Sequence, residues 1–514
     1  MEAKDVNYLK EILTSNIYDV ASVTALEKAS FLSDTFDNNI LLKREDKQIG
    51  HSFKIRGVYN KIKKILKTNK NIICASNGNH AYAVAYVCHK FDCKSIAVLP
   101  KIILQNKVAS IEKLGTNVIL YGDTFEEAQE YAKKYADEHK FVYIDPFDDV
   151  DIIAGNGTIG MELVNQLGSD IENIHAIFVP IGGGGLISGI AVYIKELYPS
   201  VKIIGVGIEN SCAMDDALKN NSVTCLDKVT TFAESTSVKK VCLNTFNICK
   251  KYVDEIILIS VDEICTAIKY IHEDTKTIVE PACAMSIAGL CKYIDKYNIV
   301  KKNLIAIMSG GVVSFEKLKF ITERANIGNK SEANIKITIP EKPNSLLTLL
   351  KHIDDQCTSD VMNITQFHYR ANNKENASII VGFTISGDIG TKYIIDSIGM
   401  KYKVDEFSHT MISSYIPFLI GGSVNKLASE YIFTITLPER PGALMELLTI
   451  TKNLINITMF HYNNIGDIRG NILMGIQLRG IEYANFILLL NKINMITYND
   501  ETTFFNKLIC MPSI

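Results

Sequence analysis

Four consecutive glycines are the most informative chemical feature of this sequence, because they stand between an apolar run at residues 175–181 and an amphipathic run that begins at Leu186. The pattern predicts a buried strand, a turn made only of backbone, and the first turn of a helix. In that arrangement several free N–H groups and the positive end of a helix dipole converge on one anion. The expected ligand is a phosphate. The residues of this segment, called the glycine loop below, are Gly182, Gly183, Gly184, Gly185 and Leu186.

The glycine loop does not match the two common phosphate-binding motifs. A nucleotide-triphosphate loop would end in Gly-Lys-Ser/Thr, whereas Leu186 follows the last glycine. A dinucleotide fingerprint is a near miss, with Ser188 in the place of its third glycine and Glu209 as the acidic residue. A flexible turn without a ligand is the remaining alternative. Because each glycine costs about 0.5–1 kcal/mol where order is required, we expect a bound group to offset that cost.

A second candidate is Lys54, in the sequence His-Ser-Phe-Lys-Ile-Arg-Gly at residues 51–57 near the start of a predicted helix. A lone lysine is usually a solvated surface residue. Two further segments change that interpretation: residues 71–80 predict a buried strand entering a helix N-terminus, and residues 304–311 predict a strand ending in Ser-Gly-Gly. A lysine held in a partly apolar pocket has a lowered pKa, so it can act as both imine former and base.

These segments together resemble the fold-type II pyridoxal-phosphate enzymes, and within them the biosynthetic threonine dehydratases, over nearly the whole chain. The motif at residues 52–57 is similar to the one that carries the Schiff-base lysine of the family, and Ser-Asn-Gly-Asn-His at residues 76–80 is similar to its Ser-x-Gly-Asn-His motif. The resemblance implies that Lys54 binds the cofactor and is catalytic, that Asn79 donates a hydrogen bond to the cofactor's 3′-oxygen, and that Ser309 faces the pyridine nitrogen. It also implies that the glycine loop holds the phosphate of pyridoxal 5′-phosphate. The substrate-binding residues that it implies are Ser76, Asn77, Gly78 and His80.

Two of these side chains have a chemical reading of their own. A serine at position 309 can hydrogen-bond an unprotonated pyridine nitrogen, whereas an aspartate would keep that nitrogen protonated. The weaker electron sink suits β-elimination, in which the carbanion expels its leaving group promptly. Phe53 could pack on the cofactor ring or belong to the ordinary core, and the sequence leaves both open.

Several positions depart from the family pattern. The anchors for lysine, phosphate and ring nitrogen are all kept, so we expect a working cofactor site with an altered lining. A catalytically weakened enzyme is the alternative. The departures that we expect in the lining are Asn77, Tyr82, Ser235, Cys283 and Val312.

Composition sets limits on function. The chain has 514 residues, 47% of them hydrophobic, and a formal net charge of -3, so it gives no electrostatic support for nucleic-acid binding. Its twelve cysteines form no C-x-x-C pair, and neither zinc nor any other metal is suggested. The first ten residues contain acidic side chains and no apolar core, which argues against a signal or transit peptide. No run reaches about 18 apolar residues, so we expect no membrane span and a cytoplasmic protein.

The order of predicted elements indicates the architecture. From about residue 40 to 325 short β-rich runs alternate with longer helical patterns, which predicts parallel sheets covered by helices on both faces. The resemblance implies a two-lobed α/β catalytic domain at residues 1–325, with a smaller movable lobe at about 55–150 and the cofactor in the cleft between the lobes.

An internal repeat follows a polar linker near residue 325. Residues 338–350 are echoed at 436–448, and Asn-Ile-Thr-x-Phe-His-Tyr occurs at both 363–369 and 456–462. The repeat resembles tandem α+β ACT-like regulatory domains, at 326–427 and 428–514, which implies binding of isoleucine and valine. We expect a homotetramer, and a role in assembly alone is the alternative to regulation for the repeat. The residues expected at the effector pockets are Pro343, Asn344, Phe367, Tyr369, Pro441, Gly442, Phe460 and Tyr462.

Three functional classes follow from these patterns. The leading one is a lyase that converts L-threonine to 2-oxobutanoate and ammonia, under feedback control by isoleucine. The second is a related enzyme of the same fold that acts on serine or catalyses β-replacement. The third is an amino-acid sensor with a relic catalytic site. The tandem repeat argues against the second class, and only the altered motifs support the third.

Overall fold

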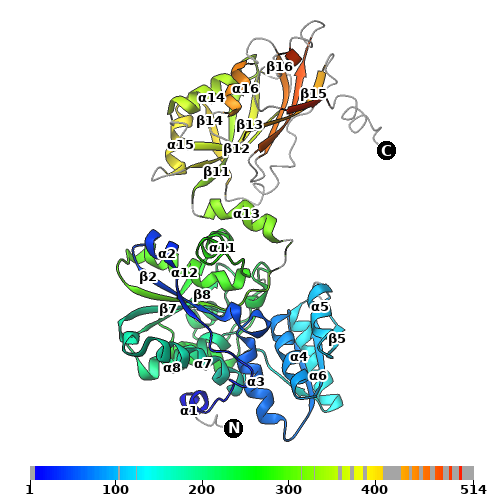
Figure 1. Cartoon of the computed structure of the whole chain (residues 1–514), viewed down its shortest axis with the longest axis vertical. Coiled ribbons are helices and arrows are strands. Elements are labelled where there is room, and N and C mark those ends of the chain that lie inside the picture. The colour runs from blue at the N-terminus through cyan, green and yellow to red at the C-terminus, as the bar shows by residue number, and fades with distance from the viewer. Residues whose placement is uncertain are drawn as a thin grey trace. The chain divides into compact units, whose positions relative to one another are not determined.

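The computed structural model divides into two compact units, Met1–Ala325 and Asn326–Ile514, which are drawn in Figure 1. Each unit is described by itself. The structure describes residues 6–101, 103, 105–122, 124–227, 229–313, 315, 317–328, 330–356, 362–370, 375–385, 390–408, 430–438, 443–450, 455–463, 469–478, 486–488 and 497–500.

The larger lobe of the first unit is built on a six-stranded sheet with the order β1-β2-β10-β7-β8-β9. Its strands are β1 (Leu26–Lys28), β2 (Asn39–Arg44), β10 (Asn303–Met308), β7 (Ile174–Pro180), β8 (Lys202–Ile208) and β9 (Glu255–Ile259). All neighbours are parallel except β1 and β2. Parallel strands require crossover connections, and helices supply them here.

Both faces of this sheet are covered, as the near-continuous apolar strands predict. Along β7, Phe178 packs into one core with α12 and α11, whereas Ile177 packs into a second core with α7 and α8. Helices α1, α2, α7, α8, α11 and α12 of this lobe are labelled in Figure 1. The helices of the lobe are α1 (Tyr8–Leu13), α2 (Ser30–Thr35), α7 (Val150–Leu167), α8 (Gly185–Leu197), α9 (Ala213–Lys219), α10 (Leu243–Tyr252), α11 (Val261–Thr275) and α12 (Pro281–Tyr297). Short 3-10 turns occur at η1 (Glu45–Lys47), η2 (Ile49–His51), η3 (Gly168–Asn173) and η4 (Glu234–Thr236).

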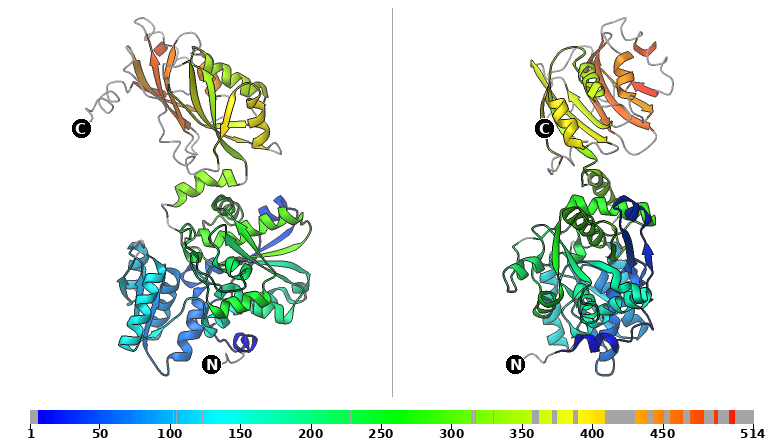
Figure 2. Two further views of the ribbon diagram at one scale, coloured as in Figure 1. Left: turned by 180° about the vertical axis from the view of Figure 1, so that it is seen from behind. Right: turned by 90° about the vertical axis from the view of Figure 1, so that its left-hand side faces the viewer.

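The smaller lobe is a four-stranded parallel sheet with the order β5-β4-β3-β6. Figure 2 shows it beside the larger lobe. Its strands are β3 (Asn71–Ala75), β4 (Lys94–Leu99), β5 (Asn117–Leu120) and β6 (Val142–Tyr143), and its helices are α4 (Asn79–Lys90), α5 (Gln105–Glu112) and α6 (Phe125–His139). Helix α3 (Lys54–Ile65) packs against both α4 and α7, so it ties the smaller lobe to the larger one.

The second unit holds one antiparallel sheet of eight described strands, in the order β14-β11-β13-β12-β16-β17-β15-β18. They are β11 (Glu332–Pro340), β12 (Met362–Arg370), β13 (Asn376–Ile385), β14 (Lys403–Glu406), β15 (Glu430–Pro438), β16 (Asn456–Asn463), β17 (Arg469–Gln477) and β18 (Thr497–Asp500). The described helices are α14 (Ser345–Gln356), α15 (Thr391–Gly399) and α16 (Ala443–Ile450), and α13 (Lys317–Gly328) precedes β11.

The strand order mirrors the sequence repeat, because β11 to β14 form one half of this sheet and β15 to β18 form the other. The halves join where β12 pairs with β16, and His368 stands directly opposite His461 in that register. The predicted fold class is confirmed: parallel sheets with helices in the first unit are followed by a repeated α+β arrangement with an antiparallel sheet.

Candidate active site

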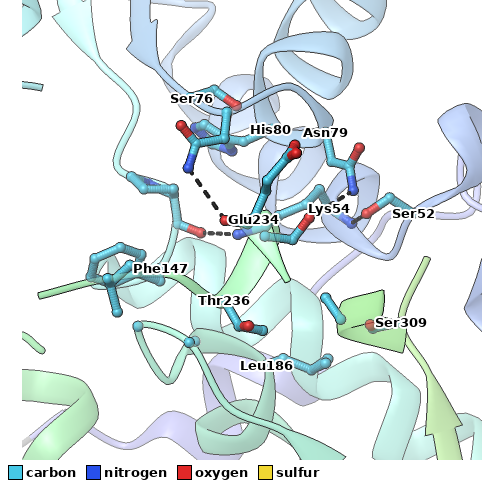
Figure 3. A pocket seen from close by; sticks show the side chains of 18 of the residues that line it. Ser52, Lys54, Ser76, Asn79, His80, Phe147, Leu186, Glu234, Thr236 and Ser309 are labelled. Atoms are coloured by element: carbon cyan, nitrogen blue, oxygen red, sulfur yellow. Dashed lines mark hydrogen bonds between the residues drawn. The ribbon is translucent and has the colours of Figure 1, made fainter. Parts of the chain in front are cut away.

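The predicted cofactor and substrate residues all line one pocket of the first unit. The pocket is formed by segments that follow β3, β7 and β10, together with the start of α3 and turn η4. In Figure 3, Lys54 lies between the segment with Ser76, Asn79 and His80 on one side and Leu186 on the other. The carboxyl ends of parallel strands are the usual ligand site of α/β folds, so the position agrees with the architecture.

The glycine loop connects β7 to α8, as its sequence predicts. Gly184 has φ 92°, which is a left-handed backbone conformation, and no side chain caps the helix that begins at Gly185. The first amides of this 13-residue helix therefore have no capping side chain, and they can bind an anion at the end of the pocket that the loop lines.

The reason for the glycines lies partly in the protein's own packing around the loop. A Cβ atom at Gly183 would lie 2.4 Å from the ring of Phe147, and one at Gly184 would lie 2.8 Å from Met214 Cε. At Gly185 the nearest atom would be the backbone oxygen of Phe147, at 2.6 Å. Close approach of the protein itself, together with the left-handed turn, therefore excludes side chains from this loop.

Lys54 is the first residue of α3, and its Nζ donates a hydrogen bond to Pro146 O at 2.8 Å. Burial lowers the pKa of Lys54 to about 8, although Asp145 and Glu280 oppose the shift. A larger fraction of the amine is thus neutral near physiological pH than in a free lysine. The ring of Phe53 lies 5.2 Å from Nζ and packs at the edge of the larger-lobe core.

Ser309 follows β10 and is 5% exposed at the pocket wall. Its backbone oxygen accepts a hydrogen bond from Phe53 N at 3.2 Å, and Ser52 forms a β-bridge with Gly310. These backbone links join the start of α3 to the end of β10. They therefore place Lys54 and Ser309 in the same pocket although 255 positions of sequence separate them.

Asn79 points toward a glutamate that the sequence interpretation did not assign to the site. Its Nδ2 donates to Glu280 Oε1 at 3.1 Å and Oε2 at 3.2 Å, and Ser235 Oγ donates to the same carboxyl group at 3.1 Å. Burial raises the pKa of Glu280. Glu280 precedes Pro281 at the start of α12. A proline at the first position of a helix is a sequence signal for the helix start, so the position of Glu280 could be predicted. Its hydrogen bond with Asn79 has no such signal.

The segment at residues 76–80, called the 76–80 loop below, is shaped by its own side chains. Ser76 Oγ accepts a hydrogen bond from Gly78 N at 2.9 Å, and Gly78 has φ 136°. Asn77 Nδ2 donates to Glu234 O at 3.3 Å. Burial, together with the charge of Lys54, lowers the pKa of His80 to about 3, so its ring is neutral.

The predicted altered lining is wrong for three of its five residues. Asn77 and Ser235 line the pocket, but Tyr82, Cys283 and Val312 do not. The ring of Tyr82 lies against Gly50, where a Cβ atom would be 2.5 Å away, and Cys283 is buried in the larger-lobe core. A departure from the family motif changes the pocket lining only where the backbone directs that side chain toward the pocket.

Four charged side chains behind Lys54 form a buried network, called the charge quartet below. Arg56 contacts Glu45 through Nε at 2.7 Å and Glu162 through Nη1 at 2.6 Å, while Lys43 Nζ contacts Glu162 Oε2 at 2.6 Å. None of the four is more than 2% exposed. Two positive and two negative charges balance, so the network can remain dry. It anchors α3, and with it Lys54, to β2, η1 and α7.

The predicted effector residues fall in different environments within the second unit. Pro343, Asn344 and Tyr369 line a second pocket, together with Leu448 of α16 and Ile457 of β16 from the second repeat. The remaining described predictions, Phe367, Phe460 and Tyr462, belong to the hydrophobic core of the unit and are at most 2% exposed. Pro441 and Gly442 lie outside the described residues.

Comparison with known proteins assigns the chain to a family. Residues 17–310 match the pyridoxal-phosphate dependent enzymes, and residues 323–413 and 421–507 match the C-terminal regulatory domain of threonine dehydratase. A biosynthetic L-threonine dehydratase of Pasteurella multocida is 38% identical over 503 residues, covering 96% of this chain and 95% of its own length. The chain belongs to the threonine dehydratase family. The resemblance stated from the sequence is thereby confirmed.

Solved structures similar to this threonine dehydratase family member share the architecture of the first unit. The processed form of threonine deaminase isoform 2 from Solanum lycopersicum is 40% identical, with a TM-score of 0.60, and covers 62% of this chain and 88% of its own. A serine racemase from Dictyostelium discoideum is 30% identical, with a TM-score of 0.54, and covers 60% of this chain and 99% of its own. The fold therefore also occurs in a protein named for another reaction.

Pyridoxal phosphate is the cofactor of this family, and the donor groups of the pocket fit it. The uncapped start of α8 suits a phosphate, Lys54 offers an amine of lowered pKa, and Ser309 offers a neutral hydroxyl. Within the described part of the chain, no cluster of three or more His, Cys, Asp or Glu side chains could hold a metal ion. Among the described helices, none is both long and apolar enough to cross a membrane.

Proposed function

We propose that this protein is a threonine dehydratase that converts L-threonine to 2-oxobutanoate and ammonia, the committed step toward isoleucine. The observation that carries the proposal is the meeting of Lys54, the glycine loop and Ser309 in one pocket. The similarity to a biosynthetic L-threonine dehydratase over 96% of the chain supports the choice of substrate. The match of the second unit to a threonine dehydratase regulatory domain supports a biosynthetic, controlled enzyme.

The residues of this chain have distinct roles in the proposed reaction. The amides of the glycine loop would hold the cofactor phosphate, and Ser309 would orient the pyridine ring with one hydrogen bond. When bound, pyridoxal phosphate supplies the electron sink for loss of the α-proton and of the β-hydroxyl group. Lys54, whose pKa is lowered to about 8, is suited to accept the α-proton near neutral pH, and the β-hydroxyl group leaves as water once it has taken up a proton.

The 76–80 loop is the proposed site for the substrate's carboxylate. It ends at the start of α4, so its backbone amides lie at the positive end of a 12-residue helix. His80 stays neutral beside it, because burial lowers the pKa of its ring to about 3, although its Nε2 lies 3.1 Å from Ile144 O. A neutral ring there adds no charge that would compete with the carboxylate.

The deciding measurement is the release of keto acid from L-threonine and from L-serine by the full-length protein with its cofactor. We expect threonine to be the better substrate by kcat/KM. A higher kcat/KM for serine would favour the second candidate, a serine-directed enzyme, which the likeness to a serine racemase supports. Cofactor binding without turnover of either amino acid would instead favour a sensor with a relic site.

The second unit is the proposed site of control by isoleucine, with valine opposing it. Its pocket combines the carboxylate of Glu341 and the ammonium of Lys342 with the apolar side chains of Leu346 and Ile457. Those groups suit a zwitterionic amino acid with an aliphatic side chain. Because a ligand shifts activity only through unequal affinity for two states, isoleucine should also change lobe closure or assembly.

A truncation tests the location of control. A chain ending at Gly328, where α13 ends, should convert threonine without responding to isoleucine. The full-length protein measured at the same concentration is the control. Inhibition of the truncated chain at the same isoleucine concentrations would place the effector site in the first unit. The homotetramer and the cytoplasmic location are part of the same proposal, and sedimentation of the full-length protein tests the former.

A further inference from the structure

One ion pair links the two lobes beside the catalytic pocket, which Glu234 lines. Lys107 Nζ, in α5, lies 2.9 Å from Glu234 Oε2, in η4. Val108, the neighbour of Lys107, is buried in the core of the smaller lobe, whereas Ala233, the neighbour of Glu234, is buried in the core of the larger lobe. Each member of this interlobe ion pair is therefore fixed to a different lobe.

Glu234 also forms an ion pair with a second lysine, Lys317. Lys317 Nζ lies 2.6 Å from Glu234 Oε1 and 3.1 Å from Phe232 O, and all three residues belong to the larger lobe. Burial would raise the pKa of Glu234, but Lys317 and Lys107 hold it below its usual value, so the carboxylate stays charged. Opening the cleft would separate Glu234 from Lys107 while its contact with Lys317 remained.

Lys107 also contacts the 76–80 loop. A Cβ atom at Gly78 would lie 3.2 Å from Lys107 Cδ and 3.7 Å from Nζ, so the lysine stem covers this glycine. The next residue back, Asn77, donates to the backbone oxygen of Glu234 at 3.3 Å. The interlobe ion pair and the loop therefore meet the larger lobe at the same turn, η4.

We propose that Lys107 is a positioning residue for the reaction, because its ion pair with Glu234 holds the 76–80 loop against the larger lobe while substrate is bound. The inference rests on the proposed function, which assigns the substrate's carboxylate to that loop. Lys107 is 16% and Glu234 36% exposed, and ion pairs that water can reach shift an equilibrium by about fivefold at most. Such a contact favours the closed cleft but still lets substrate enter and product leave.

The test compares Lys107→Met with Lys317→Met in the full-length, cofactor-loaded protein. Both variants keep the alkyl stem and remove one ammonium group from the same carboxylate, but only the first breaks the link between lobes. We expect Lys107→Met to raise KM for threonine about two- to fivefold with kcat changed by less than about twofold. Lys317→Met should shift KM by a smaller factor, and Lys107→Arg should restore the wild-type value.

Two further readouts separate positioning from a general loss of stability. Added salt should raise KM of the wild type and of Lys317→Met, and should have little effect on Lys107→Met, because the screened pair is already absent. Cofactor loss after dilution, followed without substrate by cofactor absorbance, should be about two- to fivefold faster in Lys107→Met. Equal effects of the two methionine variants, or no effect of Lys107→Met on either quantity, would overturn the proposal. Absence of threonine turnover in the wild type would instead refute the proposed function, and the cofactor-loss comparison would still report on the ion pair.

Discussion

Two buried clusters of polar side chains lie at joints of this molecule, and they solve the problem of burial differently. The charge quartet joins α3 to the larger lobe with every charge opposite a partner. At the joint of the two sheet halves, His368 Nδ1 and His461 Nδ1 lie 2.6 Å apart, but the Nε2 atom of each ring is buried with no hydrogen-bond partner among the described residues. The first cluster tolerates charge, and the second requires neutral rings.

The difference shows in the pKa values. Burial would lower the pKa of Arg56, but Glu45 and Glu162 raise it, so the quartet stays ionised over the ordinary pH range. Burial, with His461 as a lesser cause, lowers the pKa of His368 to about 3, and burial also lowers that of His461. The charge quartet of the first unit is therefore stable when its side chains are ionised, whereas the joint of the second unit is stable only while both histidine rings are neutral.

The largest expected effect is on catalytic turnover, and it concerns Lys54, two residues before Arg56. Lys54→Ala should reduce threonine turnover by at least about a hundredfold, because no other lysine stands among the described residues that line the pocket. Keto-acid release by the cofactor-saturated variant is the measurement, and a circular dichroism spectrum like that of the wild type serves as the control for folding. Retained wild-type activity would remove Lys54 from its proposed role.

Breaking the charge quartet should cost the most stability. Arg56→Met leaves Glu45 without its only quartet partner and Glu162 with Lys43 alone, so we expect a loss of about 3–5 kcal/mol in the free energy of unfolding. Urea denaturation of the cofactor-free first unit within the full chain measures it. Lys61→Met is a matched control on the same helix, because Lys61 and Asp149 are 20% and 23% exposed, and it should cost about 1 kcal/mol or less. Equal losses in the two variants would erase the contrast between buried and exposed pairs.

The histidine joint should make the second unit sensitive to acid. Because the folded pKa of His368 is lowered from 6.5 to about 3, its stabilising contribution is complete above pH 6.5 and is lost as the pH falls toward 3. The loss approaches about 1.4 kcal/mol per pH unit for one such group. Calorimetric melting of the second unit above and below pH 6.5 measures it.

Replacing both histidines of the joint by leucine should reduce the loss of stability in acid, because an apolar pair has no group that takes up a proton. His352→Leu is the control, because His352 Nε2 is also buried with no hydrogen-bond partner among the described residues of this unit but lies outside the joint. If the control reduced this loss as much as the double variant, the joint would not be its source.

The smallest expected effect is at Ser309. Ser309→Ala would remove the proposed hydrogen bond to the ring nitrogen, worth about 0.5–1.5 kcal/mol, so turnover should fall about two- to tenfold while the cofactor is retained. Steady-state kinetics and cofactor absorbance after gel filtration measure the two quantities. Release of the cofactor by this variant would show that Ser309 contributes more to retention of the cofactor than to the turnover rate.

The catalytic pocket could be predicted in part because its elements are local in the sequence. The glycine loop, Lys54 at a helix start and Ser309 after a strand each follow from a few adjacent residues, and parallel topology brings such strand ends together. The packing reason for the glycines could not be predicted, because the ring of Phe147 fills the space beside Gly183. That contact joins positions 36 residues apart and leaves no local pattern.

Long-range polar pairing explains most of what the sequence did not reveal. The Asn79–Glu280 hydrogen bond and the Arg56–Glu162 ion pair connect residues 201 and 106 positions apart, and neither has a periodic signal. The interlobe pair of Lys107 and Glu234 spans 127 positions. A charged residue in a helix is most often solvated, so only the folded chain distinguishes these residues from their neighbours.

The strand order of the second unit bears on how copies of this chain can associate. Both ends of the described sheet, β14 and β18, are strands of only four residues, and Lys403, Asp405 and Glu406 make the first of them strongly charged. Short, charged edges oppose the addition of a foreign strand, which is the route by which exposed sheets aggregate. Self-assembly that extends this sheet edge to edge is therefore disfavoured, and any subunit contact of this unit should use the faces of the sheet or its helices.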